Sequence, residues 1–469
     1  MHTIVVGGGI SGLAAAHRLL ERGSGVTVLE ATGRLGGKLL AGQIAGRAVD
    51  LGAESLLARR PEAVGLARAV GLGDALQPPA VAGGAIWTRG AVRPMPRGHV
   101  MGVPGDPAAV GDVVSPEGVA RIAQDERLPP TVLGEDATVG GYVAERLGRE
   151  VVDRLVEPLL GGVYAGDAYR ISLRAAVPQL FEAARGEPSL LAAVRDVQAR
   201  AARAGATGPV FLGIDGGVGR LPGAVADAVR AAGGRVSTDT AATALRRTPG
   251  GWEVTAEGPG GGTLHADAVV VALPAPAAAR LLRPEVPAAA RELDGFAYAS
   301  MALCTFAFRR ADLARVPGGS GFLVPWVDGR TIKAATFASN KWSWIAAQDP
   351  DLFVLRTSVG RFGEEAVLER DDADLLAASL ADLRDAAGLT ARPVASRVTR
   401  WDAGLPQYPP GHLDAVARVR AAVARHPGLA VCGAAYGGVG VPACVADGQR
   451  AAQETLAADR PGTGARMAP

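Results

Sequence analysis

Hydrophobic residues at the start of the chain follow a strand–helix–strand pattern. Residues 3–6 form a β-branched run that is typical of a buried parallel strand. Apolar residues then recur at helical spacing from Leu13 to Leu20, and Gly23 suits the end of that helix. A second apolar run at 26–29 predicts a second strand. These elements together predict a β-turn-α-β unit, the opening of a Rossmann-like domain.

The pattern changes further along the chain. Charged and apolar residues mix at helical spacing from 104 to 207, which predicts a block of helices. Short strands follow, ending in the fully apolar run 268–273. From 275 to 395, segments such as ASMALCTFAFRR predict an antiparallel sheet. We therefore expect an α/β unit, a helical insertion and a separate sheet domain.

The stretch CGAAYGGVGVPACVADG near the end of the chain is compatible with two structures. No charged residue occurs between Leu429 and Ala446, a length close to that of a membrane span. Four glycines and Pro442 weaken a helix there, however, and favour a turn that approaches another group closely. We therefore predict a strand at 429–432, a glycine turn and a helix at 445–456 rather than a span.

Composition and charge exclude several classes of protein. The 469 residues suffice for two or three domains, and the formal net charge of +2 with interspersed signs argues against a nucleic-acid partner. Cys304, Cys432 and Cys444 are odd in number and far apart, which favours a reducing compartment. The opening MHTIVV does not resemble a signal peptide, and the histidines show no metal-ligand spacing. We expect a cytoplasmic protein without a metal site.

The turn between the first strand and the helix carries the spacing G-x-G-x-x-G. Gly7 permits the tight turn, Gly9 lets the backbone approach a pyrophosphate, and Gly12 allows the helix to pack closely on the strand. Glu30 closes the second strand, where its carboxylate can accept the hydroxyls of an adenosine ribose. Because all these parts are present, a dinucleotide site is favoured over a purely structural turn. The residues expected to hold its phosphates are Gly7, Gly8, Gly9, Ile10, Ser11 and Gly12.

The residues after Glu30 distinguish between two dinucleotides. Arg34, Gly36 and Gly37 complete E-x-x-x-R-x-G-G, which resembles the signature of the glutathione-reductase-like flavoproteins in their amine-oxidase branch. The resemblance implies FAD, since a nicotinamide enzyme has no use for the second glycine pair. Lys38 departs from the family pattern, which usually ends in Arg. The implied FAD contacts extend to Glu30, Ala31, Arg34, Gly36, Gly37, Lys38, Gly52, Ala53, Glu54, Ser55, Ala242, Val439, Gly440 and Val441.

An ordered set of motifs along nearly the whole chain is similar to that of the oxygen-dependent porphyrinogen oxidases. The motifs are GGGISGLAAA, EATGRLGGKL, PMPRGHVMGVP, GGVGRLPGAV, TFASNKWSW, LPQYPPGH and GAAYGGVGVPACVADG. More narrowly, the chain resembles the bacterial form assigned to coproporphyrinogen III. The resemblance implies an α/β fold with α+β parts and three domains. These are a discontinuous Rossmann-like FAD-binding domain (1–84, 208–274 and 396–469), an antiparallel-sheet substrate domain (85–103 and 275–395) and a helical insertion of the membrane-associating kind (104–207).

The resemblance also implies an activity. It is the oxidation of coproporphyrinogen III to coproporphyrin III with oxygen, in haem biosynthesis, releasing six electrons and forming three molecules of hydrogen peroxide, with the flavin carrying the chemistry. Protoporphyrinogen IX oxidation is the alternative. Two further alternatives are another flavin amine oxidase and a non-enzymatic protein like the GDP-dissociation inhibitors. We expect at most peripheral membrane contact, and a hand-over of product to a downstream haem-pathway enzyme.

The substrate implies a further set of residues. A porphyrinogen is apolar in the middle and carries propionates at its rim, so its site needs aromatic walls and a few cations. The candidates are Arg97, Lys341, Arg356, Tyr408 and His412, with Arg93, Lys333 and Arg361 as further cations. A solvated surface charge is the alternative for each cation, and a structural role is the alternative for Tyr408 and His412.

Overall fold

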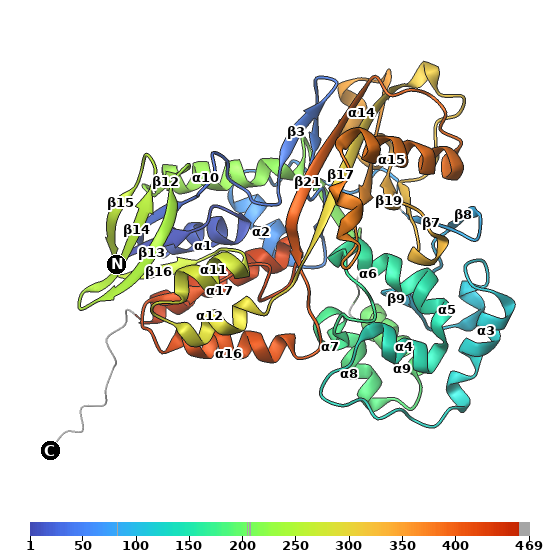
Figure 1. Ribbon diagram of the computed structural model, residues 1–469, viewed down its shortest axis with the longest axis horizontal. Helices are drawn as coiled ribbons and strands as arrows, with labels where there is room; N and C mark the ends of the chain where they lie inside the picture. Colours follow the sequence, from blue (N-terminus) through green and yellow to red (C-terminus); the bar gives the residue numbers. More distant parts are fainter. Residues whose placement is uncertain (82, 204, 206–207, 459–469) are drawn as a thin grey trace.

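Three bodies of secondary structure make up the described chain. The computed structural model describes residues 1–81, 83–203, 205 and 208–458. Figure 1 shows a unit around α1 (Ile10–Glu21), a sheet around β17 (Tyr298–Arg309) and a group of helices around α4 (Val139–Leu147). Across the described residues, no helix combines the length and the apolar character needed to cross a bilayer.

The first body is built on a parallel five-stranded sheet with the order β12-β2-β1-β16-β22. Val5 in the central strand lies between Val28 and Val270 of its neighbours. The chain leaves the central strand in one direction and returns on its other side, so the topological switch point lies at the carboxyl end of β1. The strands are β1 (His2–Val6), β2 (Gly25–Leu29), β12 (Arg235–Ser237), β16 (Ala268–Val271) and β22 (Leu429–Val431).

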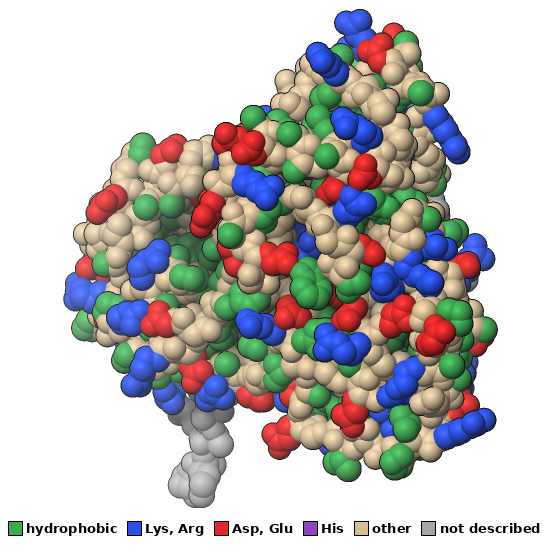
Figure 2. Space-filling view, turned by 45° about the vertical axis from the view of Figure 1, so that its right-hand side comes forward, with side chains coloured by type: hydrophobic (Ala, Val, Ile, Leu, Met, Phe, Trp, Pro, Cys, Tyr) green, Lys and Arg blue, Asp and Glu red, His purple; other side chains and the backbone are tan. Residues whose placement is uncertain are grey.

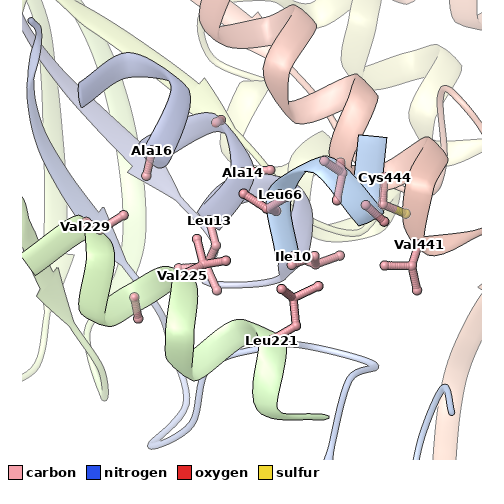
Figure 3. Close-up of a cluster of buried hydrophobic side chains, with 14 of the residues drawn as sticks. Ile10, Leu13, Ala14, Ala16, Leu66, Leu221, Val225, Val229, Val441 and Cys444 are labelled. Carbon is pink, nitrogen blue, oxygen red and sulfur yellow. The ribbon is translucent and has the colours of Figure 1, made fainter. Parts of the chain in front are cut away.

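Alternate residues of this sheet face two different layers. Val5, Val28 and Val270 face a layer of helices, in which Ile10 and Leu13 meet side chains of neighbouring helices (Figure 3). Gly448 makes the closest of these approaches possible, because a side chain there would overlap the Ser11 carbonyl oxygen. These helices are α1, α2 (Pro61–Ala69), α10 (Leu221–Ala231) and α17 (Val441–Ala458).

The opposite face of the sheet carries a second layer. Ile4, Val6 and Val269 pack there against a small antiparallel sheet and three helices. The predicted fully apolar run 268–273 is thus buried because both faces of its strand are covered. The elements of this layer are β13 (Ala241–Thr248), β14 (Gly251–Glu257), β15 (Gly262–Ala266), α11 (Ala275–Leu282), α12 (Pro287–Asp294) and α16 (His412–Ala424).

The second body is a seven-stranded sheet with the order β21-β17-β20-β19-β18-β7-β8. Helix α15 (Asp372–Ala387) covers one face, where Leu375 and Leu383 pack with Phe306 and Phe353. Against the other face lie β3 (Ala41–Ile44), β4 (Arg47–Asp50), α13 (Ala338–Lys341) and α14 (Ser343–Gln348). The remaining strands of the sheet are β7 (Ala85–Thr88), β8 (Ala91–Pro94), β18 (Gly321–Leu323), β19 (Ile332–Thr336), β20 (Leu352–Val359) and β21 (Ala395–Pro406).

The third body is helical and has its own apolar core. Most of its charged side chains face solvent, but Arg146 is 1% exposed and donates to Asp125 at 2.5 Å and to the Pro129 carbonyl oxygen at 2.6 Å. Besides α4, the helices are α3 (Pro116–Ala123), α5 (Arg149–Val151), α6 (Glu157–Tyr164), α7 (Leu173–Ala176), α8 (Pro178–Gly186) and α9 (Leu190–Arg203). Two further short sheets are present: β5 (Leu56–Leu57) and β6 (Leu76–Gln77) flank β11 (Phe211–Ile214) in one, and β9 (His99–Val100) pairs with β10 (Val103–Pro104) in the other.

The structure differs from the predicted domain limits in two places. Strand β21, expected in the FAD-binding domain from 396 onward, pairs with β17 at both of its ends, with one irregularity between them, and belongs to the antiparallel sheet. Helices α11 and α12, expected in the substrate domain, pack on the parallel sheet. Local sequence cannot settle either point, because the partner of a strand and the surface under an amphipathic helix are decided by tertiary contacts.

Candidate functional site

The first glycine turn connects the carboxyl end of β1 to α1. Gly7 has a φ of 112°, which favours glycine, and its N–H donates to the Leu29 carbonyl oxygen at 2.7 Å. A side chain at Gly12 would overlap the Gly7 carbonyl oxygen, whereas a Cβ added at Gly9 would meet no atom within 4 Å. The backbone is therefore tightly packed at Gly12, whereas the space beside Gly9 is open.

Helix α1 begins directly after this turn without a side-chain cap. Gly9 is its N-cap residue, and the first turn contains no acidic residue. The first N–H groups and the positive end of the helix dipole therefore favour an anion. A pyrophosphate has the required charge, and the open space over Gly9 lets it approach the backbone.

Glu30 stands at the end of β2 beside the same turn. Its Oε2 accepts a hydrogen bond from the Gly8 N–H at 2.8 Å, and its Oε1 accepts from the N–H and hydroxyl of Thr32 at 2.9 and 2.7 Å. A carboxylate offers about four acceptor sites, so at least one remains for a ribose hydroxyl. Thr32, which fixes the orientation of the carboxylate, was not among the predicted residues; Ala31, which was, is exposed beside it.

The second glycine segment lies directly against the first. The Gly36 N–H donates to the Gly8 carbonyl oxygen at 2.8 Å, and Arg34 donates to the Gly37 carbonyl oxygen at 2.8 Å. The Arg34 guanidinium also lies 5.7 Å from the centre of the Trp401 ring. Trp401 was not among the predicted residues. The one signal for it in the sequence is that it is an aromatic residue in the segment that leads back to the FAD-binding domain.

Lys38 follows this segment and is half-buried. Burial lowers the pKa of its ammonium group, the Cys444 sulfur opposes this shift, and the Arg34 charge adds to it. The charged neighbours that shift its pKa thus include no carboxylate. A buried cation without an anionic partner is costly, so Lys38 fits the binding of an anionic group of a cofactor at this position.

Residues 52–55 run alongside Lys38. The Ala53 N–H donates to the Lys38 carbonyl oxygen at 3.1 Å, and a side chain at Gly52 would overlap that oxygen. Glu54 is 8% exposed, while Ser55 is half-buried. The backbone of this segment therefore lies against the backbone of Lys38.

Two predicted substrate cations meet Glu54, which was predicted as a cofactor residue. The Glu54 carboxylate forms ion pairs with Lys341 at 2.6 Å and with Arg356 at 3.2 Å. Burial alone would raise the pKa of Glu54, but the Arg356 and Lys341 charges outweigh it and hold that pKa at about 2. Arg356 also donates to the Gly52 carbonyl oxygen at 2.8 Å. Both cations therefore tie the 52–55 segment to the antiparallel sheet.

The uncharged stretch near the end of the chain contains the predicted strand, glycine turn and helix, as β22 and α17. The helix begins at Val441, four residues before the predicted start at 445, because a proline such as Pro442 is compatible with the first turn of a helix. Asp447 holds the glycine turn in place. Its Oδ2 accepts from the Gly433 N–H at 2.9 Å, and its Oδ1 accepts from Arg420 at 2.6 Å and Arg450 at 2.8 Å. Of the predicted residues here, Val439 is half-buried, Gly440 is exposed and Val441 is buried.

Tyr408 and His412 support the same turn from α16 and the residues before it. Their rings are stacked, with centres 4.0 Å apart. The Tyr408 hydroxyl donates to the Ala434 carbonyl oxygen, and His412 Nε2 lies 3.0 Å from the Ala435 carbonyl oxygen, so this nitrogen carries the proton. Burial lowers the pKa of His412 to about 4, although the hydrogen bond opposes it. Both polar groups are thus engaged with the backbone of the turn.

The other predicted residues lie apart from this set. Arg97 is exposed in the loop between β8 and β9, and Arg93 donates to the Thr88 carbonyl oxygen of its own hairpin at 3.3 Å. Ala242 is half-buried on β13, where it packs against the core of the second layer of the first body. Lys333 and Arg361 are buried together at another place, between α6 and the antiparallel sheet.

The geometry of the turns fits FAD. The uncapped helix start and the space over Gly9 suit a pyrophosphate, Glu30 keeps an acceptor for the ribose, and Lys38 supplies a cation. The turn before α17 brings a second helix N-terminus to this unit, where it favours negative charge on a reduced flavin. No group of metal-ligating side chains occurs in the described ranges.

Known proteins are similar to this chain over its whole length. The profile of the flavin-containing amine oxidoreductases matches residues 10–456. A coproporphyrinogen III oxidase of Mycobacterium tuberculosis is 39% identical over 468 residues, covering 97% of each chain, and one of Bacillus subtilis is 30% identical, covering 97% of this chain and 98% of the relative. A crystal structure provisionally assigned as a protoporphyrinogen oxidase, from Exiguobacterium sp. 255-15, superposes with a TM-score of 0.83 at 31% identity, covering 96% of this chain and 98% of the other. The chain therefore belongs to the flavin-containing amine oxidoreductase family, in its porphyrinogen oxidase branch.

Proposed function

We propose that the protein is an FAD-dependent oxidase that converts coproporphyrinogen III to coproporphyrin III with oxygen as the acceptor, in haem biosynthesis. The observation that carries the proposal is the 39% identity to a mycobacterial enzyme of that name over 97% of both chains. When bound, FAD takes hydride equivalents from the macrocycle and passes electrons to oxygen, which yields hydrogen peroxide.

The residues of this chain position the cofactor and shape its surroundings. The turns at Gly9 and Gly37, with Glu30, hold the dinucleotide, and Tyr408 and Asp447 fix the turn that faces it. An exposed reaction centre would admit water and allow side reactions, so apolar cover is expected over it. The protein thus contributes binding, orientation and exclusion of water rather than a nucleophile.

An apolar seam beside this turn supports a large hydrophobic substrate. Val439 of the turn and Leu323 of β18 are half-buried, and both pack against the core of the helical body, which contains Tyr164 and Tyr408. Apolar side chains from all three bodies therefore pack on this one core. A macrocycle that is apolar in the middle suits such walls.

Protoporphyrinogen IX is the second candidate substrate. The structure from Exiguobacterium, which carries that assignment, favours it at 31% identity. Protoporphyrinogen carries two propionates and two vinyl groups, whereas coproporphyrinogen carries four propionates. A site built for the four propionates of coproporphyrinogen leaves cations unpaired when it binds protoporphyrinogen, at about 1–3 kcal/mol for each lost partner.

The test is turnover of both porphyrinogens by the purified holoenzyme under identical conditions. Porphyrin fluorescence and peroxide release give the rates. We expect kcat/KM for coproporphyrinogen III to exceed that for protoporphyrinogen IX by at least about tenfold, since about 1.4 kcal/mol corresponds to a factor of ten. Equal or faster turnover of protoporphyrinogen would give the assignment to the second candidate, and no turnover of either would refute both.

We further propose a cytoplasmic protein with at most peripheral membrane contact, which passes its product to a later enzyme of haem synthesis. Interspersed charges support the location: on the face in Figure 2, cationic and anionic side chains are intermixed, with hydrophobic ones scattered between them. A membrane-inserted face needs a broad apolar stripe instead. Recovery mainly in the membrane pellet after low-salt lysis would contradict the location.

A further inference from the structure

Lysine is rare in this chain, and its three positions are unusual. Of the 49 basic residues, only Lys38, Lys333 and Lys341 are lysines, and none of them is exposed. Arginine fills every cationic position on the described surface. Lys38 follows the second glycine segment and Lys341, at the end of α13, pairs with Glu54, whereas Lys333 lies elsewhere and is 6% exposed.

Lys333 sits at an irregularity in β19, where the register shifts between Ile332 and Ala334. Its Nζ donates to the Gly360 carbonyl oxygen at 2.8 Å, which is its one hydrogen bond among the described residues. An ammonium group has three donors, so two remain without an acceptor. A buried ammonium group in this state favours a further oxygen ligand.

Arg361 lies beside Lys333 and is 7% exposed. It donates to the Val324 carbonyl oxygen at 3.0 Å, which leaves most of the donors of its guanidinium group for other partners. Its Nε lies 3.7 Å from Glu157 of α6, and its Nη1 lies 3.9 Å from Glu364, whose side chain is 43% exposed. Both distances are too long for direct hydrogen bonds.

The cluster therefore has more buried positive than negative charge. Two buried cations face one buried carboxylate, that of Glu157. Burial lowers the pKa of Lys333 to about 7, the Arg361 charge adds to this, and Glu157 opposes it. Burial also raises the pKa of Glu157 to about 7, against the effect of Arg361. The lowered pKa of Lys333 shows that Glu157 does not offset the effects of burial and of Arg361, so a second anion nearby would stabilise the charged form of Lys333.

The cluster borders the apolar seam beside the cofactor turn. Helix α6, which carries Glu157, packs against β18 and β19. A Cβ added at Gly162 of the same helix would lie 3.8 Å from Leu323, a residue of the seam. The cluster and the seam therefore share α6 and β18, so an anionic group at the edge of an apolar molecule in the seam has these two cations in its neighbourhood.

We propose that Lys333 and Arg361 form a carboxylate subsite that binds one propionate of the porphyrinogen. The inference rests on the proposed function and names the residues that recognise the rim of the substrate. The carboxylate accepts from the free donors of both cations and gives the cluster the second negative charge. It also fixes which edge of the macrocycle points toward the helical body, and so which bridging carbon faces the flavin.

The test couples a change in the protein to a change in the ligand. Coproporphyrin III and its tetramethyl ester, which has no carboxylates, are titrated into the holoenzyme, and binding is followed by quenching of porphyrin fluorescence. Lys333→Met should weaken binding of the acid by about tenfold, because it removes a charge-assisted hydrogen bond, and leave binding of the ester unchanged. Arg315→Met, which removes an exposed arginine of the same body, should change neither.

Two outcomes would overturn the proposal. One is an equal loss of affinity for acid and ester, which would indicate a purely structural role for Lys333. The other is no loss at all. FAD content and melting temperature are measured for every variant; if Lys333→Met does not retain FAD, Lys333→Gln, whose amide can still donate to Gly360, replaces it. Binding is independent of turnover, so an enzyme that oxidises only protoporphyrinogen IX fails the proposed function but is still tested here, with protoporphyrin and its dimethyl ester.

Discussion

Glu54→Gln perturbs a buried ion-pair group of the cofactor site that joins two parts of the fold. Glu54 is 8% exposed and pairs with Lys341 at 2.6 Å and Arg356 at 3.2 Å, which tie the 52–55 segment to the antiparallel sheet. Glutamine keeps the size of the side chain but removes its charge. Lys341 and Arg356 are then left together without an anion, in an environment where an unpaired charge is costly.

The magnitude follows from the pKa of the carboxyl group. Its pKa falls from 4.5 to about 2 in the folded protein, because the two cations outweigh the effect of burial. At about 1.4 kcal/mol per tenfold change in proton affinity, the charged form of Glu54 contributes about 3 kcal/mol to the free energy of unfolding. Since the folded pKa is depressed, this contribution is present above pH 4.5 and is lost as the pH falls toward 2.

The assay is urea unfolding of the wild type and Glu54→Gln, followed by tryptophan fluorescence and FAD release from pH 7 downward. We expect a difference of about 3 kcal/mol at pH 7 that shrinks below pH 4.5. Glu62→Gln is the matched control, because Glu62 forms an ion pair of 2.8 Å with Arg60 at the surface, where such pairs contribute about 0–1 kcal/mol. A loss in Glu54→Gln no larger than in Glu62→Gln, or a loss independent of pH, would refute this reasoning.

Three further substitutions test other parts of the site and fold. Lys38→Met should weaken FAD binding by about tenfold or more, measured as flavin released on dilution; unchanged retention would show that the cofactor does not use this cation. Tyr408→Phe removes the donor to the Ala434 carbonyl oxygen and should lower the free energy of unfolding by about 1–3 kcal/mol, while an unaltered urea midpoint would contradict a bracing role. Arg146→Met leaves the buried Asp125 unpaired and should destabilise the helical body by about 3–5 kcal/mol, seen as a lower melting temperature; wild-type stability would be inconsistent with a buried pair.

The strand–turn–helix elements of the first body were predictable, because the sequence patterns that indicate them are local. The apolar periodicity and glycine spacing that predicted a strand, a turn and a helix correspond to β1 (His2–Val6) and α1 (Ile10–Glu21). The strand, glycine turn and helix at the end of the chain were predicted on the same basis and are confirmed as β22 and α17. In both places the backbone itself makes the site, so residue type and spacing carry the information.

The side-chain network around these turns was not predictable. Glu54 and Lys341 are 287 positions apart, and nothing near either residue indicates that they pair. From the sequence, Glu54 was predicted to bind the cofactor and Lys341 to bind the substrate. Neither prediction could take into account the ion pair that the two residues form with each other. The pairing of β21 with β17 was missed for the same reason: hydrogen-bonded neighbours in a sheet depend on the path of the whole chain.

Anaerobic reduction of the bound flavin by coproporphyrinogen III tests the central claim most directly. The holoenzyme is mixed with coproporphyrinogen III in the absence of oxygen, and the flavin absorbance is followed in a stopped-flow instrument. The proposed function predicts that the absorbance of oxidised flavin is lost as porphyrin forms, that admitting oxygen restores it with release of peroxide, and that protoporphyrinogen IX reacts more slowly. Flavin that stays oxidised with coproporphyrinogen III would contradict the claim.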